Sequence, residues 1–268
     1  MAMPYDPTTS TNGSNRSSWV YDYDTPISTQ SPCVIGPTGS GKSTFINMIL
    51  GQERMKVGHE QESCTSVVSA IPVLPSKASV CNRIGNRKVL LVDTPGFDNT
   101  EVDDMKVLGE ITNCLEDLYR HHHTMGGIIY LQDISLDRVS ASTMMCIDLV
   151  NKACGILGLR HVVLGATKCN RLSAAEVENR MIQLKGVHWK GMMDMGAQAF
   201  PLAYDPLSDA QSLLDAVLER FEPGVLLDIQ REFRRTKDIR NTSVGKRLIQ
   251  YISRWKRAFQ RIFQFDFF

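Results

Sequence analysis

The segment GPTGSGKS, residues 36–43, is the feature that most constrains the fold of this chain. It follows a short apolar stretch at 33–35 and precedes a helical pattern at 42–50 that Gly51 closes. The segment fits the pattern G-x-x-x-x-G-K-[ST], in which glycines let backbone N–H groups turn inward around phosphates. A strand, a glycine-rich loop and a helix in this order predict a phosphate-binding loop.

The loop also predicts individual roles in binding a nucleotide. Lys42 is expected to reach the β- and γ-phosphates, and the Ser43 hydroxyl is expected to be a ligand of Mg²⁺. The N-terminus of the following helix adds a partial positive charge. The predicted phosphate-binding residues are Gly36, Pro37, Thr38, Gly39, Ser40, Gly41, Lys42, Ser43 and Thr44.

A second motif, DTPG at 93–96, ends the apolar stretch VLLVD fifty residues after the loop. We expect Asp93 to lie near the metal and the Gly96 amide to sense a γ-phosphate. The polar segment 57–68 between the two motifs should supply a further metal ligand. Thr65 is the first choice for this ligand and Ser66 the second; the alternative is that Thr65 is an ordinary threonine of a surface loop.

A third motif, TKCN at 167–170, takes the place of the base-recognition pattern [NT]-K-x-D. Thr167 and Lys168 match the pattern, and the Lys168 stem can lie along a purine ring. The pattern's aspartate, which accepts from guanine N1 and N2, is replaced by Asn170, whose amide is both donor and acceptor. Guanine is favoured over adenine, but this replacement should weaken its recognition.

Strand and helix patterns alternate along the chain, which predicts an α/β fold. We expect a three-layer domain with a mostly parallel sheet and helices on both faces, followed by a C-terminal helical extension. The expected parts are a flexible N-terminal tail (1–28), the nucleotide-binding domain (29–222) and a basic amphipathic helical extension (223–268). Seven scattered cysteines without a CxxC pair favour reduced thiols inside the cell, and no apolar run approaches the length of a membrane span.

The order GPTGSGKS, CTS, DTPGFD and TKCN resembles the Ras-like P-loop GTPase superfamily over residues 30 to 222. DTPGFD and GPTGSGKSTFIN are similar to the septin and immunity-associated GTPase branch. GHEQESCTS, GIIYLQDISLDRVS and HWKGMMDMGAQAF are most similar to fungal G domain-containing proteins, in which the base motif is often degenerate. The resemblance implies a Ras-like G domain, GTP and GDP as ligands, and a homodimer that pairs across the nucleotide face.

The residue after DTPG bears on catalysis. Ras-like enzymes that hydrolyse GTP with their own residue carry a glutamine there, whereas this chain carries Phe97, which cannot orient water. Hydrolysis should therefore be slow or depend on a group from elsewhere, such as a partner or a second copy. His59 and Arg138 are candidates for that group, although each is more simply explained as a solvated loop residue.

The C-terminal segment 231–268 carries net charge +8, whereas the whole chain carries +1. Apolar residues at 243–263 recur at helical spacing, and Lys and Arg lie off that stripe. This helix could fold back on the domain, lie on an anionic membrane, or bind a protein partner. The expected location is cytoplasmic, with peripheral membrane contact as an alternative.

These patterns together predict a GTP-binding switch with slow or partner-stimulated hydrolysis, its catalytic residues being Lys42, Thr65, Gly96 and His59. The alternative is a catalytically weak nucleotide-binding scaffold anchored by its C-terminal helix. An ATP-using kinase is disfavoured because DTPG and TKCN have no role in such an enzyme. No motif predicts specific nucleic-acid binding.

Overall fold

The computed structural model describes most of the chain, including a six-stranded sheet. The described residues are 29–52, 68–73, 89–97, 104–120, 126–203, 205–220, 222 and 225–263. The predicted N-terminal tail lies outside them, and the boundaries predicted at 28 and 222 stay predictions.

Six strands form one sheet in the order β2-β3-β1-β4-β5-β6. The strands β1, β3, β4, β5 and β6 run parallel, and β2 at the edge pairs antiparallel with β3. The mostly parallel sheet predicted from the sequence is therefore confirmed. The strands are β1 (Cys33–Ile35), β2 (Ser69–Val73), β3 (Val89–Asp93), β4 (Ile128–Asp133), β5 (Val162–Thr167) and β6 (Gln198–Pro201).

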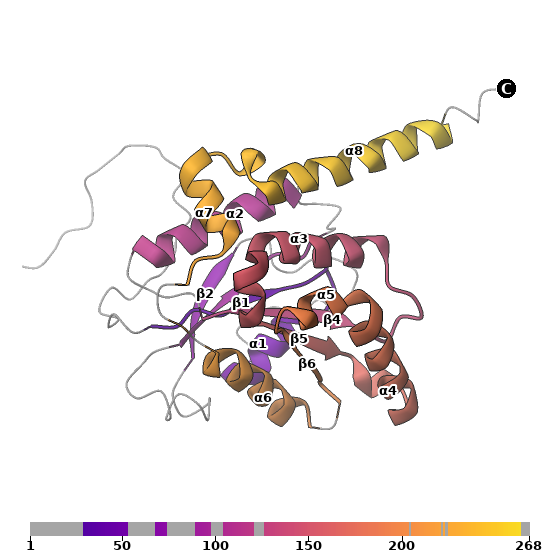
Figure 1. The fold of residues 1–268 in the computed structure, drawn as a ribbon. Helices are drawn as coiled ribbons and strands as arrows, with labels where there is room; N and C mark the ends of the chain where they lie inside the picture. Colours follow the sequence, from indigo (N-terminus) through magenta and orange to yellow (C-terminus); the bar gives the residue numbers. More distant parts are fainter. Residues whose placement is uncertain are drawn as a thin grey trace, which may run out of the picture.

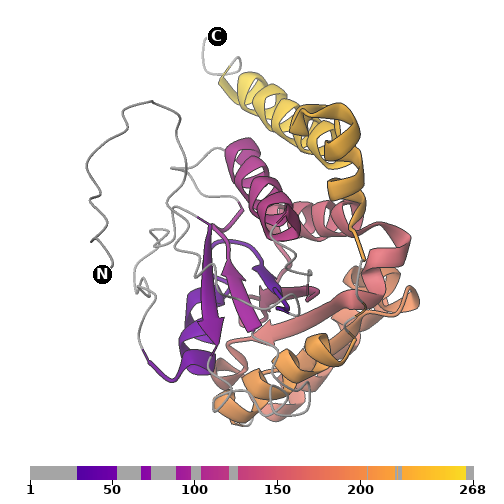
Figure 2. The same ribbon diagram turned by 90° about the vertical axis from the view of Figure 1, so that its left-hand side faces the viewer.

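Helices cover both faces of the sheet (Figures 1 and 2). Alternate residues of β1 face opposite sides: Cys33 joins the core beneath α2 and α3, and Val34 joins the core beneath α1 and α6. Each face of β1 is therefore buried, as a central parallel strand requires. The helices of this layered domain are α1 (Lys42–Leu50), α2 (Asp104–Arg120), α3 (Ala141–Gly158), α4 (Ala174–Gln183), α5 (Lys190–Asp194) and α6 (Pro206–Glu219).

Two further helices, α7 (Asp228–Thr236) and α8 (Ser243–Phe263), lie over α2 and α3. Val244 and Leu248 in the first turns of α8 are fully buried. The first part of the C-terminal helix therefore folds back onto the domain, which is one of the three possibilities raised by the sequence. From there α8 extends away from the body of the molecule (Figure 1).

The start of α7 is fitted to a break in α3. Gly155 interrupts α3 with a left-handed φ of 66°. A Cβ atom at Gly155 would lie only 1.8 Å from Asp228 Oδ2, so glycine is required both for the backbone and for the contact. The break in α3 thus makes room for the first residue of α7.

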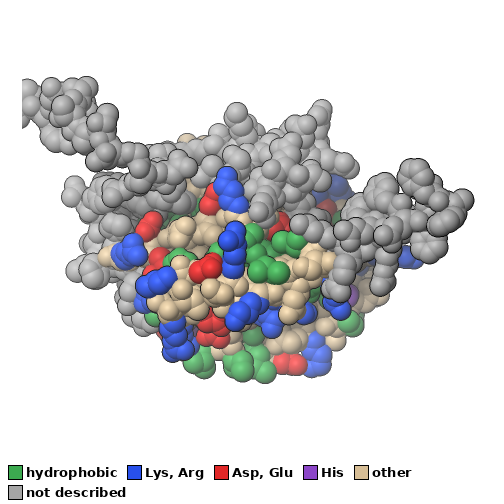
Figure 3. Space-filling view, turned by 90° about the horizontal axis from the view of Figure 1, so that it is seen from above, with side chains coloured by type: hydrophobic (Ala, Val, Ile, Leu, Met, Phe, Trp, Pro, Cys, Tyr) green, Lys and Arg blue, Asp and Glu red, His purple; other side chains and the backbone are tan. Residues whose placement is uncertain are grey.

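Arginines of the basic extension are paired with acids. Arg234 Nε donates to Glu116 Oε1 on α2 at 2.9 Å, and Arg247 donates to Asp148 on α3. Seen from the α8 side, Lys and Arg side chains are interspersed with Asp and Glu (Figure 3). Part of the extension's positive charge is therefore neutralised by the domain beneath it.

Helix α3 differs from one expectation. The stretch 141–161 is long and apolar enough to span a membrane by length and composition alone, although no such run was expected. Half of its most apolar window is buried inside the protein, where α3 packs between the sheet and α7 and α8. Its apolar character is explained by burial on two sides. The five cysteines that the structure describes are buried free thiols.

Candidate functional site: the carboxyl edge of the sheet

The predicted motifs meet at one edge of the sheet. The glycine-rich loop follows β1, DTPG closes β3, and TKCN follows β5. Because β1, β3 and β5 are parallel, their carboxyl ends lie at the same edge, where ligands of open α/β sheets bind. Segments that are far apart in the sequence are thus brought together here.

The phosphate end of this site is the loop from Gly36 to Ser43 and the start of α1. The helix begins after Gly41 without a side-chain cap, and its first turn contains no acid. The backbone N–H groups of the first turn of an α-helix have no acceptor within the helix, and the helix dipole presents a positive end there. Such an end suits an anionic phosphate group.

Lys42 is the charged side chain of the phosphate end. Its Nζ donates to the carbonyl oxygens of Gly36 and Pro37, at 3.1 and 3.0 Å, and the residue is buried. Burial lowers the pKa of Lys42 to about 8, although the nearby carboxylate of Asp93 raises it. The ammonium group is thus held over the loop and is poorly hydrated, which strengthens its attraction for a phosphate.

The DTPG segment rests directly on the loop. Thr38 N donates to the Phe97 carbonyl oxygen at 3.1 Å, and Thr38 Oγ1 approaches the same oxygen at 3.3 Å. A Cβ atom on Gly96 would lie 2.5 Å from Thr38 Oγ1, so only glycine allows this approach. Gly96 therefore lies where its backbone is in contact with the phosphate-binding loop.

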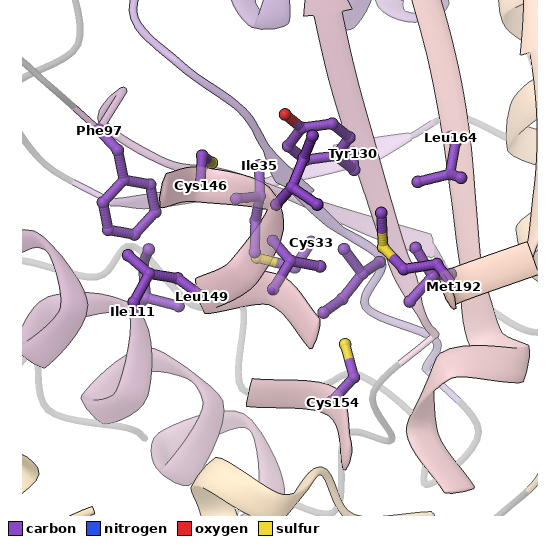
Figure 4. Close-up of a cluster of buried hydrophobic side chains, with 14 of the residues drawn as sticks. Cys33, Ile35, Phe97, Ile111, Tyr130, Cys146, Leu149, Cys154, Leu164 and Met192 are labelled. Atoms are coloured by element: carbon purple, nitrogen blue, oxygen red, sulfur yellow. The ribbon is translucent and has the colours of Figure 1, made fainter. Parts of the chain in front are cut away.

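Phe97 points away from the phosphate end. Its side chain is only 3% exposed and packs into the apolar core with Ile111 of α2 and Leu149 of α3 (Figure 4). The sequence predicts that Phe97 does not orient water, and its buried position agrees with that prediction. Its burial adds that the side chain anchors the segment after DTPG to the core.

Hard oxygen donors for a cation are present beside the loop. Asp93, at the end of β3, is fully buried and close enough to Lys42 to affect its pKa, and Ser43 is the second residue of α1. A carboxylate and a hydroxyl are oxygen donors of the kind Mg²⁺ takes, usually together with phosphate oxygens. Among the described residues, no group of three or more His, Cys, Asp or Glu side chains could hold a metal by itself.

The base end of the site is formed by Thr167, Lys168 and Asn170. Thr167 is buried, and its Oγ1 donates to the Ser40 carbonyl oxygen at 2.8 Å, which ties β5 to the phosphate-binding loop. Lys168 has a left-handed backbone (φ 57°), and Asn170 is exposed in the following turn. The structure therefore brings Thr167 against the loop, places Lys168 directly after it, and leaves Asn170 at the surface.

Some predicted site residues are not placed. Thr65, Ser66 and His59 lie outside the described residues. Arg138 is described and is exposed in the bend after β4. Its proposed role in hydrolysis stays a prediction.

One residue of this edge was missed. Asp133, the last residue of β4, lies beside Thr167 in the sheet register, and its Oδ2 accepts from Lys168 Nζ at 2.6 Å. The only signal in the sequence was an acid at the carboxyl end of an apolar strand, the same signal that marked Asp93. No spacing rule connects residues 133 and 168, because their contact depends on the pairing of two strands.

The fold and the three motifs at this edge define a P-loop GTPase of the Ras-like type. Residues 33–190, more than half of the chain, match the model of the AIG1 family. The chain belongs to the AIG1 family, and it is a GTP-binding protein.

Solved structures agree on the fold. Toc33 from Arabidopsis thaliana in complex with GDP and Mg²⁺ superimposes with a TM-score of 0.56 at 14% identity, covering 72% of this chain and 84% of that chain. The structure of Era bound to MgGDPNP and a segment of 16S ribosomal RNA gives 0.50 at 17% identity, covering 74% and 58%. At these identities the likeness concerns the fold alone.

A curated relative matches over a shorter stretch. The small ribosomal subunit biogenesis GTPase RsgA 2 of Vibrio parahaemolyticus is 30% identical over 86 residues. The match spans 30% of this chain and about a quarter of that protein.

Proposed function

We propose that this protein is a nucleotide-dependent switch that hydrolyses GTP to GDP and phosphate slowly by itself and faster when a second copy completes its site. Phe97 is the observation that carries this proposal. The residue directly after DTPG is buried in the core, so it offers no polar group to an attacking water. A group that orients this water must then come from another part of the chain or from another molecule.

The proposal gives roles to residues of this chain. Lys42 and the first amides of α1 hold the phosphates, and the Gly96 amide senses the γ-phosphate. Ser43 and Asp93 would hold Mg²⁺ together with Thr65, and the ion, when bound, neutralises negative charge on the phosphates.

The base is proposed to lie at the carboxyl end of β5. Thr167 fixes this end to the loop, the stem of Lys168 supports the base, and Asn170 lies at its rim. Guanine is the proposed base because the family is a GTPase family, although Asn170 lacks the second acceptor of an aspartate.

The dimer is supported by a relative of similar fold. For the translocon components atToc33 and psToc159, dimerization is described as important for GTPase activity, and that structure superimposes with a TM-score of 0.52 at 14% identity. We extend this to a second copy of the present chain facing the nucleotide. His59 is the proposed source of the missing polar group, and no nucleic-acid partner is part of the proposal.

Single-turnover GTP hydrolysis at increasing protein concentration tests the proposal. The rate constant per molecule should rise with concentration and reach a plateau when the dimer is saturated. A measurable rate constant that does not change with concentration would contradict the dimer. Binding that Lys42→Ala abolishes, without measurable turnover at any concentration, would favour the scaffold alternative.

A matched variant tests the role given to Phe97. Phe97→Gln introduces the glutamine that Ras-like enzymes use when they hydrolyse GTP with their own residue. In this chain the glutamine side chain would enter the apolar core. We expect no gain in intrinsic hydrolysis and a loss of roughly 3 kcal/mol in the free energy of unfolding. Accelerated hydrolysis with unchanged stability would show that residue 97 faces the nucleotide in solution.

We further propose a cytoplasmic location with peripheral membrane contact through the part of α8 beyond the docked turns. This part, 255–263, contains Trp255, Lys256, Arg257, Phe259 and Arg261, a mixture typical of interfacial helices. Deleting 255–268 leaves the buried Val244 and Leu248 in place and should abolish binding to vesicles containing phosphatidylserine. Unchanged binding after this deletion would reject the anchor.

A further inference from the structure

The base end of the site contains an ion pair that none of the motifs predicts. Lys168 Nζ and Asp133 Oδ2 are 2.6 Å apart, and their side chains are 29% and 14% exposed. Solvent screens exposed ion pairs, and their side chains stay mobile. A partly buried pair with a short contact holds its two side chains in one geometry. This pair is of the second kind.

Asp133 is itself held in place. Its Oδ1 accepts from the backbone N and the Oγ of Ser135, at 2.8 and 2.7 Å. Burial raises the pKa of Asp133, whereas the hydrogen bonds from Lys168 and Ser135 lower it. The hydrogen bonds together have the larger effect, so the pKa lies below its usual value. Asp133 is therefore an ionised and rigid acceptor for Lys168.

Lys168 needs such a support. Among the described residues only Lys168 and Lys237 combine a side chain with a positive φ. The left-handed conformation is unfavourable for residues with a Cβ atom and persists where the surroundings enforce it. The strand end is fixed by Thr167 on the loop and by Ile134 N, which donates to the Thr167 carbonyl oxygen at 3.2 Å.

We infer that Asp133 is the positioning residue of the base site: it holds Lys168 by its ammonium group, so that the lysine stem is already arranged as a support for the purine ring. The base-recognition pattern has a carboxylate two residues after the lysine. In this chain Asp133 of the neighbouring strand β4 supplies a fixed carboxylate instead. It acts on the lysine, whereas the patterned aspartate acts on the base itself. The inference rests on the proposed role of Lys168 in nucleotide binding.

Asn170 provides an independent reason for this arrangement. It is exposed, and its amide cannot offer guanine two acceptors. Base affinity must then depend more on the surface that the lysine stem provides. A lysine stem free to move would lose conformational entropy when the base binds, and the Asp133 contact removes that loss in advance.

The test is a double-mutant cycle on nucleotide binding by the full chain, with Asp133→Asn, Lys168→Met and the double variant. Competition by GDP reports on the whole site, and competition by inorganic tripolyphosphate reports on the phosphate end alone. Asp133→Asn should weaken GDP binding about tenfold and leave tripolyphosphate binding unchanged. In the Lys168→Met background, Asp133→Asn should have no further effect.

A control separates positioning from general destabilisation. Asp148→Asn removes the ion pair of α3 with Arg247, another partly buried pair, whose side chains are 30% and 34% exposed and which lies outside the sheet edge that forms the site. It should lower the melting temperature as Asp133→Asn does and leave GDP affinity unchanged.

Three results would overturn the inference: equal weakening of GDP and tripolyphosphate, additive effects in the double variant, or unchanged GDP affinity in Asp133→Asn. Failure of the proposed function is a separate result, since the wild-type protein would then show no GDP binding that Lys42→Ala abolishes.

Discussion

The phosphate end and the base end of this nucleotide site follow different rules. At the phosphate end the sequence matches the pattern at every position, and the proposed contacts come mostly from backbone amides and one lysine. At the base end the proposed contacts come from side chains, and one position of the pattern is altered at Asn170. Contacts made by backbone amides require glycines at set positions of the loop. A contact made by a side chain can instead come from a residue on another strand.

Removing the charge at the phosphate end should have the largest effect. Lys42→Ala deletes a buried ammonium group that is held over the loop. GDP and GTP affinity should fall at least about a hundredfold, because a poorly hydrated cation binds phosphate strongly. Isothermal titration with GDP measures this loss; an affinity within a few-fold of wild type would mean that the amides suffice.

Restoring the pattern at the base end should have the next largest effect. Asn170→Asp gives guanine two acceptors for N1–H and N2–H, and the site is exposed enough to receive the change without repacking. The ratio of GDP to ADP affinity should rise about tenfold or more. If the ratio stays constant in competition titrations, residue 170 does not contact the base.

The two ends should also differ in their response to pH. The pKa of Lys42 is about 8, and phosphate binds its cationic form, so affinity should fall above pH 8 by up to about tenfold per pH unit. The stability of the nucleotide-free protein changes in the opposite direction: between about pH 8 and 10 the unfolded state binds more protons, so this group adds stability as pH rises.

Titrations of GDP between pH 7 and 9.5 measure the first effect. Lys42→Arg keeps its charge throughout this range and should give a flatter profile. A profile that remains equally steep in Lys42→Arg would assign the titration to another group.

The smallest effect is expected at the link between the two ends. Thr167→Val removes the hydrogen bond to the Ser40 carbonyl oxygen and keeps the shape of the side chain. The free energy of unfolding should fall by about 1 kcal/mol and GDP affinity by a few-fold. Chemical denaturation measures the free energy of unfolding, and titration of the same variant measures GDP affinity. A loss of stability without a loss of affinity would mean that the phosphate end and the base end bind their parts of the nucleotide independently.

The elements of the G domain were predictable because burial patterns determine them. Strands such as 89–93 and 128–133 are apolar throughout, and the helix at 174–183 has the capping box that the sequence shows at Ser173 and Glu176. The glycine-rich loop was predictable because its chemistry requires its residues in sequence order.

Other features depend on contacts that no local pattern contains. Helix α7 is short and strongly polar, and it is held by the burial of Ile229 and by the pair of Arg234 with Glu116. The direction in which Phe97 points and the contact of Asp133 with Lys168 arise from packing and strand register. For this reason the base end was understood less well from the sequence than the phosphate end.

The break in α3 at Gly155 has a consequence for dividing the protein into parts. The gap occupied by Asp228 exists only because residue 155 lacks a side chain, so the G domain is shaped for its extension. A fragment that stops at 222 would leave this gap and the surfaces that cover Val244 and Leu248 open to solvent. The smallest fragment that folds independently is therefore expected to reach at least residue 250, and domain exchange with a relative should transfer α3 and α7 together.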